Sequence, residues 1–210
     1  MQAVSSAKAD SNMPKLRLGP EDWVMAGFRA LAADGPQAVR AETLARGLGA
    51  TKGSFYWHFK DLAALHQAML DAWAALATTA LTTAAQAAGA DPRARLLRLV
   101  DLVSVLPEVE VAGGALEPAI RDWGRVDPRA GAVLARVDRH RIAALRDLLA
   151  EAGLSPDAAE DGAVALYAAL IGLDSLRRTA RVAMRGPLRR VAEGLLATQS
   201  PGPNPAAGAA

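Results

Sequence analysis

The strongest constraint on the fold of this chain is the way glycine and proline punctuate an alanine-rich sequence. Alanine is the best helix former, and the β-branched runs that favour strands are scarce. Helix terminators, several of them followed by a proline suited to a first helical turn, recur at 34–36, 89–92, 113–114, 126–128, 153–156 and 186–187. We therefore predict an all-α fold of about nine helices, near residues 20–34, 41–48, 52–58, 61–83, 92–105, 116–124, 128–152, 156–184 and 187–198.

Composition narrows the class of protein. The 210 residues are 51% hydrophobic and 22% charged, values typical of a globular protein with a real core. The absence of cysteine excludes disulfides and thiolate zinc sites and fits the reducing cytoplasm, where we expect the protein to act. The first residues carry no apolar segment of a secretory signal. The uncharged run 72–90 is rich in alanine and threonine, which insert poorly into lipid, so we expect no membrane partner.

Charge is distributed unevenly along the chain. Residues 15–60 hold seven basic and four acidic side chains, a net charge of +3, whereas the whole chain sums to +2. A positive N-terminal region on a slightly negative remainder suits a polyanionic partner such as nucleic acid.

The most informative segment is 44–59, Leu-Ala-Arg-Gly-Leu-Gly-Ala-Thr-Lys-Gly-Ser-Phe-Tyr-Trp-His-Phe. It reads as two short helices joined by a tight turn, in which Gly49 supplies a conformation that other residues resist. Thr51 is placed to cap the second helix. An inner face of Phe55, Tyr56 and Phe59, together with Leu44 and Leu48, would hold the pair against the first helix. This is the layout of a helix-turn-helix.

The outward face of the second short helix predicts a DNA-reading surface. Recognition helices enter the major groove by their first residues, so Lys52 and Ser54 are best placed for base edges, and Gly53 lets the backbone come close. Trp57 and His58 point away from Phe55, so we expect them to contact DNA rather than to pack in the core. Contacts to phosphate oxygens, which set register and supply salt-sensitive affinity, are expected from Thr51, Tyr56, His58 and Lys60.

Residues 48–60, Leu-Gly-Ala-Thr-Lys-Gly-Ser-Phe-Tyr-Trp-His-Phe-Lys, resemble the signature of the TetR family of transcriptional regulators. The preceding helix, its stop at Asp34-Gly35, and the long helix after Asp61 also sit at the family's spacing, so the resemblance covers about residues 20–70. Many members carry Thr or Ser at the start of the second helix. Here Val39 and Arg40 stand there, and Arg40 could make the phosphate contact instead.

The resemblance implies a domain organisation and a mechanism. It implies a helix-turn-helix domain at 19–62 and a helical effector-binding and dimerisation domain at 63–198, between a flexible arm at 1–18 and a disordered tail at 199–210. The last two long helices would pair across a two-fold axis to make a homodimer. A small-molecule effector would release this repressor from palindromic, double-stranded operator DNA.

Two sets of residues in the second domain can each be interpreted in two ways. An effector pocket, or alternatively a closed core, would contain Trp73, Val103, Trp123, His140 and Tyr167. A dimer interface, or alternatively an internal core, would contain Leu166, Leu170, Leu173, Leu188, Val191 and Leu195.

Other functions fit the sequence less well. We see no nucleophile–base pair, phosphate-binding glycine loop or carboxylate–histidine metal cluster, so we expect neither an enzyme nor a cofactor. His66 and His140 are expected to be plain packed or surface residues. A protein-interaction module that has lost DNA affinity remains the alternative, and the basic and polar residues from Lys52 to Lys60 argue against it.

Overall fold

A computed structural model describes residues 18–86, 91–109 and 115–198, and this part of the chain is helical without a strand. The elements are α1 (Pro20–Asp34), a 3-10 turn (Pro36–Ala38), α2 (Ala41–Gly47), α3 (Lys52–His58), α4 (Leu62–Gln86), α5 (Pro92–Val109), α6 (Leu116–Val126), α7 (Pro128–Glu151), α8 (Pro156–Ala180) and α9 (Arg185–Ala197). The all-α prediction is confirmed. The predicted arm (but for Leu18), the tail, and the break at Gly113-Gly114 lie outside the described residues.

Helices α4 and α5 run on to Gln86 and Val109, beyond the predicted ends at 83 and 105. Two further helix ends differ from the sequence-based prediction for local reasons. Gly124 does not end α6, which runs on to Val126. A Cβ at Gly124 would lie 3.4 Å from Gly131 Cα, so this glycine serves the close approach of α6 to α7 rather than termination. Helix α8 ends at Ala180 rather than at 184, because Arg181 takes the left-handed conformation with φ 54°.

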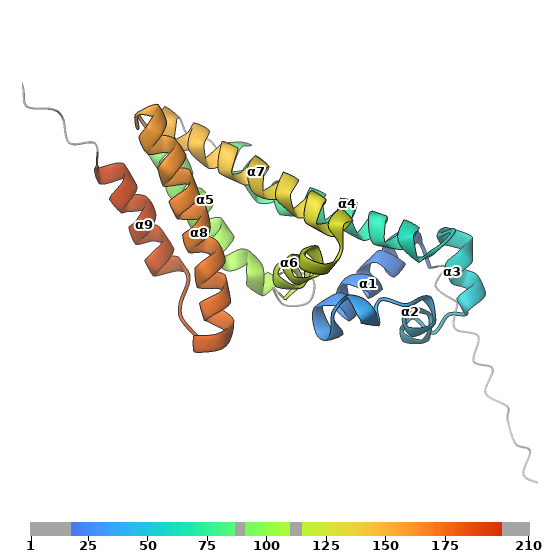
Figure 1. Ribbon diagram of the computed structural model, residues 1–210. Coiled ribbons are helices and arrows are strands. Elements are labelled where there is room, and N and C mark those ends of the chain that lie inside the picture. The colour runs from blue at the N-terminus through green and yellow to red at the C-terminus, as the bar shows by residue number, and fades with distance from the viewer. Residues whose placement is uncertain (1–17, 87–90, 110–114, 199–210) are drawn as a thin grey trace, which may run out of the picture.

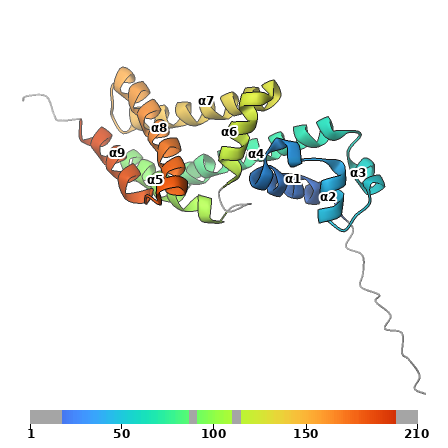
Figure 2. The same cartoon turned by 60° about the horizontal axis from the view of Figure 1, so that its bottom comes forward.

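The helices form an elongated molecule (Figure 1). Helices α1 to α3 lie at one end, α8 and α9 at the other, and α4 and α7 run lengthwise between the two ends. Figure 2 shows α6 between the lengthwise helix α7 and the α1–α3 end. This arrangement sets the short helix α3 at an extremity of the molecule, where it can meet a large partner.

Two hydrophobic clusters form the core of the protein, one toward each end of the molecule. The first, which we call the head cluster, joins α1, α2 and α3 to α4, α6 and the start of α7. The second, the body cluster, joins α5, the end of α7, α8 and α9. The head therefore shares its core with helices beyond residue 62, and the predicted division at 62/63 does not separate two cores.

Candidate DNA-binding surface

The turn that precedes α3 is built by local sequence. Gly49 has φ 62°, a value that favours glycine, and Ala50 N–H donates to Ala45 O at 2.8 Å to close the turn. Thr51 Oγ1 then accepts a hydrogen bond from Ser54 N–H at 3.1 Å and caps α3 as predicted. The direction in which α3 leaves the turn is thus fixed by backbone geometry and a single hydroxyl.

An aromatic core fixes the inner side of α3. Phe55 is fully buried and meets Trp23 of α1 edge-to-face, with 5.4 Å between ring centroids. Phe59 stacks on Phe55 at 5.7 Å and is also buried. Gly27 allows α1 and α4 to pack closely, because a Cβ there would lie 2.6 Å from Met69 Sδ. A helix of seven residues is not stable by itself, so packing against this aromatic core holds α3 in place.

The outer side of α3 carries the residues that we name the recognition surface. Lys52, Gly53, Tyr56 and Trp57 are exposed, and Ser54 and His58 are partly buried. Trp57 is 89% exposed, an unusual position for the largest apolar side chain unless a partner covers it. Tyr56 corrects one expectation: it is 52% exposed and lies over the edge of Phe55 instead of belonging to the inner face.

The cations around this surface differ in how they are held. Lys52 Nζ pairs with Glu42 Oε1 of α2 at 2.5 Å, and this bond lowers the pKa of Glu42 and raises the pKa of Lys52. Arg40 is exposed at the start of α2, and its Nε donates to Gln37 O at 2.9 Å. Lys60 is exposed just beyond α3.

Comparison with known families decides what this arrangement is. Residues 24–69, from α1 into α4, match the sequence model of the bacterial regulatory proteins of the tetR family. Residues 24–69 are a DNA-binding region of the tetR type. The chain is accordingly a DNA-binding regulator, and the helix-turn-helix predicted from the sequence is confirmed.

Solved structures share the fold over nearly the whole chain. A transcriptional regulator from Rhodococcus sp. RHA1 has a TM-score of 0.70 at 18% identity, over 86% of this chain and 95% of its own. A protein of Saccharomonospora viridis in complex with choline has a TM-score of 0.70 at 19% identity, over 86% and 96%. A TetR transcription regulator from Haloarcula marismortui has 0.70 at 16%, over 85% and 96%. A search of curated proteins finds no match.

The residues predicted to line an effector pocket are distributed over both hydrophobic clusters. Trp73 and Trp123 are buried in the head cluster, whereas Tyr167 lies in the body cluster and Val103 packs against it. His140 is exposed on α7, because the buried face of that helix runs through Val133, Val137 and Leu145. The two tryptophans thus belong to one hydrophobic cluster and Val103 and Tyr167 to the other, while His140 lies outside both.

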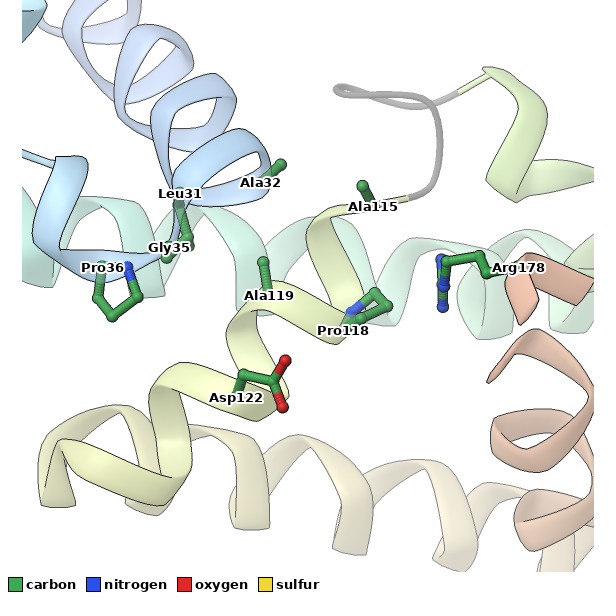
Figure 3. A pocket seen from close by; sticks show the side chains of 9 residues that line it. All are labelled: Leu31, Ala32, Gly35, Pro36, Ala115, Pro118, Ala119, Asp122 and Arg178. Atoms are coloured by element: carbon green, nitrogen blue, oxygen red, sulfur yellow. The ribbon is translucent and has the colours of Figure 1, made fainter. Parts of the chain in front are cut away.

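A pocket of about 280 Å³ lies between the head and α6. Its apolar wall comes from the end of α1, the 3-10 turn and α6, with Asp122 and Arg178 as the charged members. Figure 3 shows Leu31 and Pro36 on one side of Pro118 and Arg178 of α8 on the other. No residue of the predicted pocket is among its lining residues.

The predicted dimer residues divide into two groups. Leu166 and Leu188 are 2% and 1% exposed inside the body cluster, so they are corrected to internal core. Leu170, Leu173, Val191 and Leu195 are partly buried and pack against the same cluster. The apolar side of α8 that remains exposed is offset from them and carries Val164, Ala168, Gly172 and Leu176.

A polar cluster at the junction of four helices was not predicted. We call it the junction cluster: Glu117 and Arg121 of α6, Asp138 and Arg141 of α7, and Tyr167 of α8. Tyr167 Oη donates to Asp138 Oδ1 at 2.7 Å and accepts from Arg121 Nη2 at 2.9 Å. Arg141 Nη1 pairs with Glu117 Oε1 at 3.0 Å, and Arg141 Nε donates to Ala77 O of α4 at 3.0 Å.

The electrostatics of the junction cluster favour a charged Asp138 and a neutral Tyr167. Burial raises the pKa of Tyr167 to about 12. Burial alone would raise the pKa of Asp138, but hydrogen bonds from Arg121 and Tyr167 outweigh it and lower the value. The i, i+4 spacing of Glu117 and Arg121 was a signal available in the sequence, but the partners on α7 and α8 were not.

The described residues contain neither a membrane-spanning helix nor a metal-binding group of side chains. Among these residues, no helix is both long and apolar enough to cross a bilayer, and no group of histidine and acidic side chains has the geometry of a metal site. His66 packs edge-to-face on Trp123 with 5.0 Å between ring centroids, in line with the expectation of a packed histidine.

Proposed function

We propose that this regulator is a homodimeric repressor of the TetR family that binds a palindromic operator and is released by a small-molecule effector. The observation that carries the proposal is the outward face of α3, where Trp57 and Lys52 stand in solvent on a helix whose other face is locked into an aromatic core. A protein that binds by such a face acts by recognition rather than by catalysis, in the cytoplasm where DNA is accessible.

The residues of the recognition surface divide by chemistry. Lys52 and Ser54 read base edges from the start of α3, and Gly53 admits close approach of the backbone. Trp57 covers apolar parts of the groove. Hydroxyls and charges around them hold phosphates and fix the register, namely Arg40, Thr51, Tyr56, His58 and Lys60.

Selection of bound fragments from random duplex DNA tests this proposal. We expect a two-fold symmetric consensus, with affinity that falls steeply as salt rises because phosphate contacts release counterions. Lys52→Ala should relax base preference, whereas Lys60→Ala should weaken all sequences alike. Affinity that is flat across the salt series would contradict the proposal and favour a protein-interaction module.

The homodimer is proposed to form through the exposed side of α8, together with the partly buried Leu170, Leu173, Val191 and Leu195. The support is the apolar stripe of Val164, Ala168, Gly172 and Leu176, of which Val164 and Leu176 are 48% and 47% exposed in one subunit. Ala168→Arg should give monomers in sedimentation, while Ala132→Arg at an exposed position of α7 should not. If both the Ala168→Arg and the Ala132→Arg variant sediment as dimers, the proposed interface is wrong.

Effector release is proposed for residues 63–198, with 19–62 as the DNA-binding part. The fold is known to accommodate a small molecule in at least one protein, because the Saccharomonospora viridis structure holds choline. The pocket between α1, α6 and α8 is a candidate site, since a ligand there would touch both parts of the chain. A thermal-shift screen, followed by operator release with each hit, tests this; a stabilising ligand without release would count against it.

A further inference from the structure

We propose that Glu42 is a specificity-determining residue, which holds Lys52 of the recognition surface and so restrains attraction to DNA of any sequence. This inference rests on the proposed role of α3 in binding operator DNA. Glu42 is an acidic residue of α2 within the positively charged head, and the inference assigns it a function.

The geometry places one acid directly against the first residue of α3. Lys52 Nζ lies 2.5 Å from Glu42 Oε1, so the pair bridges the first turn of α2 and the start of α3. The two side chains are 53% and 57% exposed, which leaves both open to a duplex docked on the recognition surface. The pair lowers the pKa of Glu42 and raises the pKa of Lys52, so each group favours the charged form of the other.

The pair cancels the charge that a random sequence would attract. Non-specific affinity arises from cations that neutralise phosphates, and a lysine already paired with a carboxylate neutralises none. Arg40 is the other charged group that acts on Glu42, and its own Nε is bonded to the backbone at Gln37. Glu42 therefore neutralises mainly the charge of Lys52.

A correct base offers Lys52 a better partner than a phosphate does. Exposed ion pairs are weak, so Lys52 can leave Glu42 for acceptor atoms such as O6 and N7 of guanine. On other sequences the exchange gains only a phosphate contact and leaves a carboxylate facing a polyanion. Discrimination improves because the competing complexes are penalised more than the operator complex.

The test compares Glu42→Gln with Asp34→Asn, which removes one negative charge from an exposed acid of the same region that does not pair with Lys52. Each full-length variant is titrated with a selected operator duplex and with a scrambled duplex over a salt series. We expect Glu42→Gln to bind the scrambled duplex ~10-fold more tightly and the operator only ~2-fold more tightly, with a salt slope on scrambled DNA steeper by about 1. Asp34→Asn should change either affinity by less than ~2-fold.

Lys52→Met, alone and combined with Glu42→Gln, shows whether Glu42 acts through Lys52. We expect the double variant to bind scrambled DNA as Lys52→Met does, within ~2-fold, because the restrained group is gone. An equal gain from Glu42→Gln in both backgrounds, or an equal gain from Asp34→Asn, would overturn the inference. Weaker operator binding by Glu42→Gln would also overturn it, since Glu42 would then orient Lys52.

Failure of the underlying function gives a different result. A wild-type protein without salt-dependent DNA binding refutes the proposed function and, with it, this role of Glu42. A wild type that binds DNA while Glu42→Gln leaves both affinities unchanged refutes the role of Glu42 alone. Melting temperatures close to wild type for the exposed Glu42 and Asp34 variants would exclude misfolding as the cause.

Discussion

The recognition surface and the junction cluster use the same kinds of charged side chain for opposite purposes. At the recognition surface, Lys52 and Glu42 form a single contact and are 53% and 57% exposed. In the junction cluster, Arg121 and Asp138 are 21% and 26% exposed, and each bonds to more than one partner. Exposed charges remain available to another molecule, whereas charges that bond to each other between helices hold the protein together.

One chain thus combines a rigid support with a surface whose polar groups can exchange partners. The head gains rigidity from aromatic packing behind α3 and leaves its polar groups outward. The junction gains it from hydrogen bonds that link α4, α6, α7 and α8. Substitutions in the two regions should therefore separate binding from stability.

The largest effect is expected within α3 itself. Phe55→Ala should lower the free energy of unfolding by about 3–5 kcal/mol, because it opens a cavity beside Trp23 in a fully buried site. Urea titration measures this. Trp57→Ala is the matched control: its exposed ring should change stability by less than about 0.5 kcal/mol while weakening operator binding. Equal destabilisation by the two variants would erase the distinction between the two faces of α3.

A smaller loss of stability is expected when the junction cluster loses a cation. Arg121→Met should lower the free energy of unfolding by about 2–3 kcal/mol, because Asp138 and Glu117 lose a partner at partly buried positions. Lys52→Met removes an exposed cation and should change stability by less than about 1 kcal/mol. If the two variants unfold at the same urea concentration, burial does not distinguish these ion pairs.

The pH dependence of stability should carry the signature of Asp138. Its pKa in the folded protein lies below the ordinary value of 3.8, so its contribution is complete above that value and is lost as pH falls through the lowered one. Asp138→Asn should therefore be less stable than wild type at neutral pH and approach it in acid. Urea titrations between pH 7 and pH 2 measure the gap, and a gap that is constant with pH would contradict the shift.

The smallest effect is expected at two glycines of the helix-turn-helix. Gly49→Ala should cost about 1 kcal/mol, because φ is 62° there and a side chain resists this conformation although space is open. Gly53→Ala places its Cβ 3.6 Å from Thr51 Oγ1, an ordinary contact, so stability should hold while operator affinity falls. Melting curves with operator titrations check both, and the opposite pattern would reverse the assigned roles.

Sequence patterns were sufficient for the head because its structure is local. The bounds of α3, the Thr51 cap and the turn at Gly49 depend on residues within a few positions of each other. The 3-10 turn at Pro36–Ala38 was missed, although the hydrogen bonds of Ala38 N–H to Gly35 O and of Val39 N–H to Pro36 O that close it are local. The exposure of Tyr56 was missed because the sequence does not tell how wide the buried face of α3 is.

The amino-acid pattern is enough to predict an all-helical chain, most of its breaks, and a helix with one aromatic and one polar face. Packing between helices sets the rest: Leu166 and Leu188 face inward, His140 faces outward, and Tyr167 meets side chains from two other helices. Helical periodicity tells which residues share a face, but neighbours distant in sequence determine whether that face meets the core, a partner or water.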